Sequence, residues 1–522
     1  MLLNLSVELL EAIGAQLTRS DLAIMRAVCK DLNGALWRLF FSVLVLETKR
    51  NGFGEDGIEM LKALASGQTG WTLHARALRV IQAPPVRDEC AHNEEMVDLL
   101  AAALKSLSDI RTVVWHVRDD NFWTSAQTTI IDFLNTSVTV HELELCILGT
   151  VDLSTLQVRR LRKFTLRSPG VGWDWEPWNA ADSTPMYRDV AQLVSQNQLK
   201  SLHLDCSAAW SVIWGMMRSS SHGLKLAEIT TGVVTQELFD YLTSYSGVER
   251  LTLKLPDGGN EKESNRLADT FFETVLSRHA ESLTELCCPA AYESRFSFGA
   301  HNVNVVSQLH KLTRLEMSIN AGAVREVQEP ESYLDSDGTV HPIFPIGINV
   351  EADQADIDPV VALLLETAAM FPHLQSLTIL SAETESNRGV WCGNGRISHM
   401  GAVDAAIGNA VEAFRTNVLC SAIIRAGYNT YELRPLCGPQ EAEFERGLWY
   451  KRTGNLEEAM GIDLTERLRD PGQHGIINCS WGEDLLKDKS KAVVQQPTAS
   501  RLDDSTKKSV SGGIGDVAIS TS

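Results

Sequence analysis

LKSLHL at residues 199–204 places leucine at its first, fourth and sixth positions. Its last three residues alternate between apolar and polar, which is typical of a strand with one buried and one exposed face. The same order recurs in IRTVVW (110–115), LRKFTL (161–166), VERLTL (248–253), LTRLEM (312–317) and LQSLTI (374–379), and VHELEL (140–145) and LTELCC (283–288) fit almost as well. The pattern predicts many short strands of one kind.

Helix-like segments separate these strands. They are NEEMVDLLAAALKSL (93–107), TSAQTTIIDFLN (124–135), MYRDVAQLVSQN (186–197), TQELFDYLTSYS (235–246), NRLADTFFETVLSRHAES (265–282) and DPVVALLLETAAMF (358–371). One strand followed by one helix, repeated about every 20 to 60 residues, is the pattern of a solenoid repeat protein.

From about Thr72 to Pro435, these L-x-x-L-x-L stretches resemble the leucine-rich-repeat family. The match is to a degenerate version, because the asparagine or cysteine that the family places after the strand is missing. The resemblance implies an α/β fold built as an irregular solenoid. A doubly wound α/β sheet is the alternative. Its strands would be buried on both faces and would read as continuous apolar runs, whereas these strands alternate.

In six of the eight stretches the middle residue of the final three is polar, so one face of the predicted sheet should be exposed. In a solenoid, that face is the concave surface on which partners bind. We therefore expect a target protein to contact Glu144, Thr165, His203, Thr252, Glu316 and Thr378.

A different pattern occupies residues 5–40, LSVELLEAIGAQLTRSDLAIMRAVCKDLNGALWRLF. Leu9, Ile13 and Leu17 are four residues apart, as are Leu32 and Leu36, so we expect three short helices with apolar stripes. A unit of about forty residues is too small to bury all of its large apolar side chains in a core of its own. Some of them should face a partner.

The residues of this segment resemble an F-box in their order, which is Leu5, Glu8-Leu9-Leu10, Ile13, Leu17, Asp21-Leu22, Val28-Cys29-Lys30, Leu32 and Trp37. Ser6 stands where the family usually has proline. The resemblance implies docking onto the Skp adaptor of an SCF-type ubiquitin ligase, and through it to a cullin. The expected adaptor-binding residues are Leu5, Glu8, Leu9, Ile13, Leu17, Leu22, Val28, Cys29, Lys30, Leu32 and Trp37. The alternative is an ordinary helical cap on the repeats.

The formal net charge of −20 over 522 residues limits the partners. Nucleic acid and anionic membrane surfaces would be repelled at long range, so we expect neither as a partner. The chain has no apolar run of about 18 residues and no basic region at its start, and we expect its ten cysteines to be reduced. A cytoplasmic or nuclear location, or both, is therefore expected.

Two insertions interrupt the repeats. Residues 168–185 carry Trp173, Trp175 and Trp178, which are either aromatic anchors for the target or plugs between repeats. Residues 325–359 are acidic and should form a solvated loop. The expected domains are an F-box-like module (1–45), a solenoid (46–485) and a disordered tail (486–522).

The sequence carries no phosphate-binding loop, nucleophile elbow or paired-histidine zinc motif. We therefore expect no catalytic residue, cofactor or metal. The leading hypothesis is the substrate-recognition subunit of an SCF-type ubiquitin ligase, which works by bringing the target near the conjugating enzyme. A protein-binding repeat scaffold outside the ubiquitin pathway is the second hypothesis, and an enzyme with a site near Cys392 is the third.

Overall fold

The structure is a computed structural model of the chain. It describes residues 5–48, 54–82, 94–117, 124–168, 180–220, 223–321, 324–326, 332–334, 340–342, 350–388, 394–414, 422–426, 429–435 and 448–452.

One 14-stranded sheet runs through residues 43–452. Its first twelve strands are parallel and follow one another in chain order, whereas the last two pair antiparallel with their neighbours. The strands are β1 (Val43–Thr48), β2 (Ala77–Gln82), β3 (Thr112–Val117), β4 (Glu142–Ile147), β5 (Lys163–Arg167), β6 (Ser201–Asp205), β7 (Glu228–Thr231), β8 (Arg250–Leu253), β9 (Glu285–Cys288), β10 (Arg314–Ile319), β15 (Ser376–Ser381), β16 (Ile423–Ala426), β17 (Asn429–Pro435) and β18 (Leu448–Arg452).

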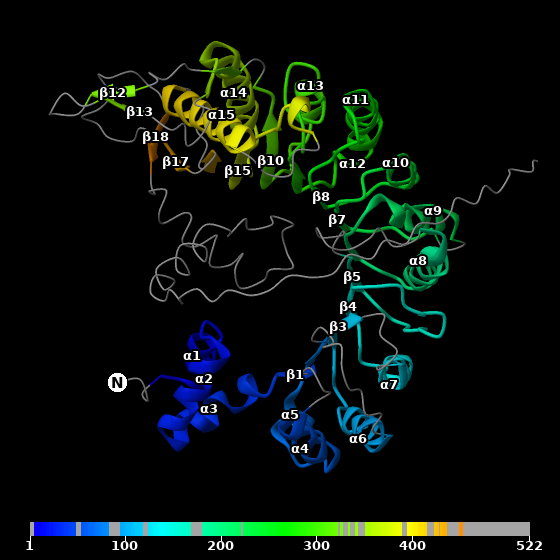
Figure 1. Cartoon of the computed structure of the whole chain (residues 1–522). Helices are drawn as coiled ribbons and strands as arrows, with labels where there is room; N and C mark the ends of the chain where they lie inside the picture. The colour runs from blue at the N-terminus through cyan, green and yellow to red at the C-terminus, as the bar shows by residue number, and fades with distance from the viewer. Residues whose placement is uncertain are drawn as a thin grey trace, which may run out of the picture. The chain divides into compact units, whose positions relative to one another are not determined.

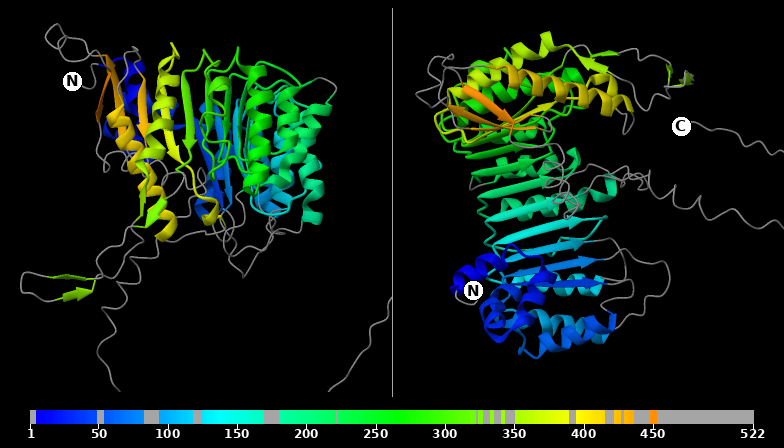
Figure 2. Two further views of the ribbon diagram at one scale, coloured as in Figure 1. Left: turned by 90° about the horizontal axis from the view of Figure 1, so that it is seen from above. Right: turned by 90° about the vertical axis from the view of Figure 1, so that its left-hand side faces the viewer.

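The helices between the strands cover one face of this sheet, which curves so that its other face lies on the inner side (Figure 1, Figure 2). They are α4 (Gly54–Ala65), α5 (Gly70–His74), α6 (Glu94–Lys105), α7 (Thr124–Thr136), α8 (Ala180–Ser195), η3 (Ala208–Ser211), α9 (Val212–Ser219), α10 (Gln236–Thr243), α11 (Glu261–Thr270), η4 (Phe271–Leu276), α12 (Ser277–His279), α13 (Val303–Val306), α14 (Gln354–Ala369), η5 (Glu385–Asn387) and α15 (Asn394–Ala413). Three helices, α1 (Val7–Gly14), α2 (Arg19–Val28) and α3 (Lys30–Phe40), precede the sheet.

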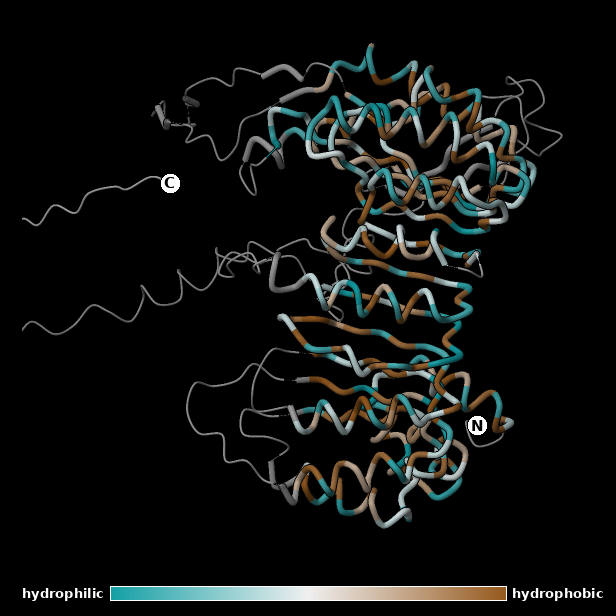
Figure 3. The backbone as a smooth tube through the Cα atoms, turned by 90° about the vertical axis from the view of Figure 1, so that its right-hand side faces the viewer, coloured by the Kyte–Doolittle hydropathy of each residue, from teal (hydrophilic) through white to brown (hydrophobic). Residues whose placement is uncertain are grey.

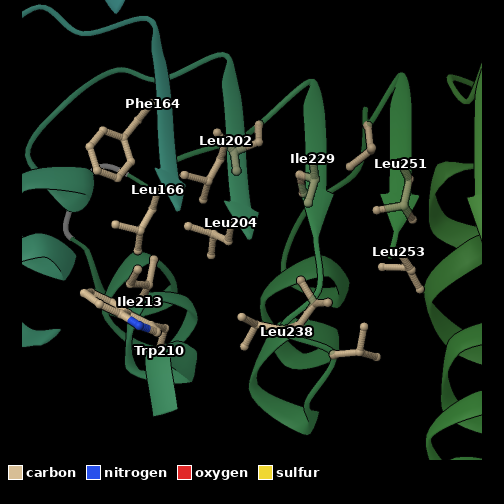
Figure 4. Packing of buried hydrophobic residues seen from close by; sticks show 14 of the residues in the cluster. Phe164, Leu166, Leu202, Leu204, Trp210, Ile213, Ile229, Leu238, Leu251 and Leu253 are labelled. Carbon is tan, nitrogen blue, oxygen red and sulfur yellow. The ribbon is translucent and has the colours of Figure 1, made fainter. Parts of the chain in front are cut away.

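The core lies between the sheet and these helices. Apolar and polar residues alternate along the central strands (Figure 3). The apolar residues of each strand point toward the helices, where Leu202 and Leu204 of β6 pack beside Trp210 and Ile213 (Figure 4). All four side chains are at most 1% exposed. One apolar cluster continues from Leu44 of β1 to Ala426 of β16, so neighbouring repeats share a core.

Consecutive parallel strands with helices on one face confirm the solenoid-like α/β body and exclude the doubly wound alternative, which has helices on both faces. A strand is present at each of the eight motifs, but it begins two residues after the first apolar residue of the motif. In LKSLHL, for example, Leu199 is already buried and β6 begins at Ser201. The motif does not mark four of the parallel strands, which are β1, β2, β7 and β16.

The two predicted insertions hold more regular structure than expected. Residues Ala180–Pro185 of the first insertion form the opening turns of α8. The second contains β11 (Val324–Glu326) with β14 (Val350–Ala352) and β12 (Ser332–Leu334) with β13 (Val340–Pro342), each pair antiparallel, and α14 begins at Gln354. The expectation of a loop throughout 325–359 is therefore wrong. The predicted tail, 486–522, lies outside the described residues.

The link between β4 and β5 is the exception among the early repeats, because residues 148–162 contain no helix. A buried asparagine, Asn197, holds its end. The side chain of Asn197 accepts a hydrogen bond from the backbone N–H of Leu161 at 2.8 Å and donates to the carbonyls of Val158 and Leu193 at 2.9 and 2.8 Å. Val151, Leu153, Leu156 and Val158 of the link are buried in the shared core, so the link packs there without a helix while Asn197 satisfies the backbone at its end.

We predict that Asn197→Ala lowers the free energy of unfolding by about 2–4 kcal/mol, because it leaves buried backbone groups without partners. Asn304→Ala is the control, since Asn304 is exposed and its side chain makes no hydrogen bond with a described residue. Urea denaturation followed by circular dichroism measures both. Equal effects of the two substitutions would contradict the assigned role.

Candidate functional site

Helices α1 to α3, hereafter the helical module, have a small core of their own. Leu10, Leu22, Leu32, Ala35 and Leu36 are buried together and form a cluster separate from the core of the sheet. Thr18 caps α2, because its hydroxyl oxygen accepts a hydrogen bond from the backbone N–H of Asp21 at 3.2 Å. The module therefore folds around its own interior instead of merging with the first repeat.

Apolar residues on α1 and α2 remain exposed. Val28 is 70% exposed, Leu9 53% and Ile13 39%. These residues belong to a set that we call the docking face, and its members are Leu5, Val7, Leu9, Ile13, Ile24 and Val28. These six side chains are all exposed in the part of the chain that the structure describes.

The structure divides the eleven residues expected to bind an adaptor. Six of them are exposed, three are half-buried and two are buried. The two buried residues are Leu22 and Leu32, which lie in the core of the module, so a partner cannot reach them and they support the fold instead. The exposed residues are Leu5, Glu8, Leu9, Ile13, Val28 and Lys30, and those half-buried are Leu17, Cys29 and Trp37. The sequence analysis missed Val7 and Ile24. Spacing could have identified Ile24, because Ile24 and Val28 are four residues apart and share a helix face.

The helical module directly precedes β1 (Figure 1), and aromatic side chains connect the two. The guanidinium of Arg26 lies 4.0 Å from the ring centre of Phe40 and 4.8 Å from that of Phe41. Phe41 meets Trp71 edge to face at 4.8 Å, and the indole N–H of Trp71 donates to the carbonyl of Val43 in β1. These contacts hold the module against the start of the sheet.

Two glycines of the module give a matched test of its packing. A Cβ atom on Gly14 would lie 2.8 Å from Leu36 Cδ2 and 2.9 Å from Leu39 Cδ2, whereas one on Gly34 would meet nothing within 4 Å. We predict that Gly14→Ala destabilises the module by about 1–3 kcal/mol through overpacking. Gly34→Ala should stabilise it by about 0.5–1 kcal/mol, because alanine loses less backbone entropy in a helix. Amide hydrogen exchange in α1 to α3 measures the stability change caused by each substitution. The prediction requires slower exchange in Gly34→Ala and faster exchange in Gly14→Ala than in the wild type.

The predicted target-binding residues of the sheet occupy one line. Backbone register places Glu144, Thr165 and His203 side by side on β4, β5 and β6. The complete line, which we call the inner ladder, is Val45, Arg79, Val114, Glu144, Thr165, His203, Thr230, Thr252, Cys287, Glu316, Thr378 and Arg425. The sequence analysis missed the members on strands with less regular motifs, such as Arg79 and Thr230.

Most members of the inner ladder are partly accessible, but Thr165 is only 5% exposed and therefore offers little surface to a partner. The two acidic members are paired. Glu144 forms an ion pair with Arg167 Nε at 3.0 Å, and Glu316 accepts a hydrogen bond from Arg314 Nη2 at 2.9 Å. The centre of the inner face thus carries hydroxyl groups and paired charges.

His203 is the one histidine of the inner ladder. Burial lowers the pKa of His203 to about 4, and the nearby cations Lys254 and Arg167 add to this effect, while Asp205 opposes it. Its Nε2 atom is buried without a hydrogen-bond partner among the described residues. At neutral pH, His203 is therefore an uncharged imidazole whose Nε2 atom is covered by the protein.

We predict that the ring of His203 shows no NMR titration midpoint above about pH 5. Since the folded pKa lies below the ordinary value of 6.5, this group contributes full stability above pH 6.5 and loses it as pH falls through about 4. Between pH 7 and pH 5 the wild type should lose about 2 kcal/mol more than His203→Gln in urea denaturation. Parallel pH profiles of the two proteins would contradict the assignment.

Several expected features lie outside what the structure describes. Trp173, Trp175 and Trp178 are not among the described residues. Within the described parts, no group of three or more histidine, cysteine, aspartate or glutamate residues could hold a metal ion, and no helix is long and apolar enough to cross a bilayer.

No protein-family model matches the chain, and no curated protein matches it. Among solved structures, the chain is similar to one described as "Crystal structure of Rad7 and Elc1 complex in yeast". The similarity covers 72% of this chain and 87% of that chain, with 12% sequence identity and a TM-score of 0.33. A TM-score this low does not establish a common fold, so the function is argued from the residues themselves.

Proposed function

We propose that this chain is the substrate-recognition subunit of an SCF-type ubiquitin ligase. The observation that carries the proposal is the uncovered docking face, on which Leu9 is 53% and Val28 70% exposed although both belong to folded helices. The order of residues in this segment resembles an F-box, and the face is where such a module would meet a Skp adaptor.

The separate core of the helical module supports this role. Because Leu10, Leu22 and Leu32 form the core of the module, the exposed apolar residues on α1 and α2 do not contribute to that core. Burying an apolar residue such as Val28 against a partner would contribute about 1.5–3 kcal/mol. Several such residues together could hold an adaptor.

The solenoid would hold the target protein, with the inner ladder as the contact surface. Its hydroxyl groups and the imidazole of His203 can donate and accept hydrogen bonds without a net charge. No residue of the chain would need to perform covalent chemistry, because the ligase acts by raising the effective concentration of target lysines near the conjugating enzyme.

We predict that Leu9→Glu combined with Val28→Glu reduces capture of a purified Skp adaptor at least about 100-fold, since two carboxylates would be buried at the interface. Both positions are exposed in the free protein, so the variant should fold normally. A pull-down followed by calorimetry measures the affinity.

The control is Val138→Glu combined with Met370→Glu on the body of the protein. These residues are 70% and 56% exposed and lie outside the helical module. The control should bind the adaptor as the wild type does. Equal retention of the adaptor by both double variants, or absence of binding by the wild type, would favour the alternative of a repeat scaffold outside the ubiquitin pathway.

A further inference from the structure

Basic side chains gather at the amino-terminal edge of β5 and β6, on the turn that leads into β5. Arg159, Arg160, Arg162, Lys163 and Lys200 are all exposed. We call them the basic edge. None of their side chains forms a hydrogen bond or ion pair with a residue that the structure describes. In a chain with a net charge of −20, five neighbouring cations without acidic partners are unusual.

Backbone hydrogen bonds set the spacing of these cations. The N–H of Lys200 donates to the carbonyl of Arg162 at 2.8 Å, and the N–H of Arg162 donates to that of His141 at 2.8 Å. Arg162 and Lys200 therefore directly precede adjacent strands, and neighbouring strands lie about 4.8 Å apart. Asn197, which binds the backbone of Val158 and Leu161, fixes the turn that carries Arg159 and Arg160. The cations stand on a rigid support.

Arg160 adds an independent observation. Its φ angle is 75°, in the left-handed region that glycine or asparagine adopts at lower cost. A strained backbone is retained where the surrounding structure enforces it, and such residues cluster at functional sites. The left-handed conformation of Arg160 also marks the turn as one whose backbone is fixed by its surroundings.

Nearby acidic groups offset only part of the charge of the basic edge. Glu142 lies beside Lys163 in register and keeps its negative charge there, although its carboxylate accepts a hydrogen bond from the hydroxyl of Thr112 at 3.3 Å. On the far side, Glu228 pairs with Arg250. On the near side, Asp109 binds Arg76 and Arg111 at 2.7 and 3.4 Å. These acids are engaged with partners outside the basic edge.

We propose that the basic edge binds an acidic segment of a partner protein, one with clustered aspartate and glutamate residues in an extended conformation. Four of the cations follow one another along residues 159–163, and Lys200 directly precedes the neighbouring strand β6. They are therefore spread along an extended stretch of backbone, which matches a row of carboxylates better than a single phosphate. A long polyanion such as DNA would be repelled by the rest of this acidic protein. The proposal does not depend on membership of a ubiquitin ligase.

The test uses the full-length protein and a fluorescein-labelled peptide of alternating glutamate and serine, about eight residues long, which spans roughly 27 Å when extended. Fluorescence anisotropy measures its affinity at about 50 mM NaCl. Combined Arg159→Glu, Arg162→Glu and Lys163→Glu substitutions should weaken binding at least about 10-fold. Combined Lys105→Glu, Lys262→Glu and Arg278→Glu substitutions, at exposed basic residues on helices, make the same change in net charge and should weaken it less than about threefold.

A single variant separates binding from folding. Arg160→Gly should raise Tm, because it relieves the left-handed arginine, yet it should weaken peptide binding about two- to fivefold through loss of one cation. Equal loss of affinity in the two triple variants would overturn the proposal, as would absence of binding by the wild type. It would also be overturned by tighter binding of duplex DNA, of phosphatidylserine vesicles, or of an otherwise neutral peptide with one phosphoserine.

Discussion

The structure depends on a pair of backbone hydrogen bonds repeated at the amino end of successive strands. The carbonyl of Arg162 accepts from the N–H groups of Lys200 and Ser201 at 2.8 and 3.1 Å, and the same pairing recurs from Arg76 to Thr313. A slip of one residue would turn every buried leucine of a strand toward solvent, so this register is strongly held. Only the strand starts are fixed, and the links between them are free to vary. The β4–β5 link without a helix and the long segment between β10 and β15 both fit one sheet for this reason.

The sequence predicts the body of the fold well because a strand buried on one face must alternate. It fails where a small or polar residue takes an apolar position. In β2 the motif begins with Ala75, which is 3% exposed, and in β7 it ends with Thr231, which is 0% exposed. Both side chains are buried like the leucines that they replace. Thr231 can be buried because its hydroxyl oxygen accepts a hydrogen bond from the backbone N–H of Val233 at 2.9 Å. Hydrophobicity alone therefore cannot find these strands.

Sites are harder to predict than strands, because periodicity shows that a helix has apolar stripes but not which stripe faces the interior. In the helical module, Leu22 and Leu32 fill the core while Leu9 and Val28 remain outside, and only the packing of three helices decides between them. Accessibility within the inner ladder has a similar origin. Thr165 lies in register between the larger side chains of Glu144 and His203, so its short side chain is covered by its neighbours.

The inner face of the sheet and its amino-terminal edge differ in whether their charged side chains are paired. On the inner face, Glu144 with Arg167 and Asp205 with Lys254 form partly buried pairs at 3.0 Å, and a paired charge has little left to offer a partner. At the amino-terminal edge, Arg162 and Lys200 have no such pairs, so their attraction for an anion is undiminished. Their backbones are held by the same hydrogen bonds that set the register. Binding a ligand there would therefore cost conformational entropy of the mobile side chains but not of the backbone that carries them. This favours an extended ligand whose charges match the spacing of the cations.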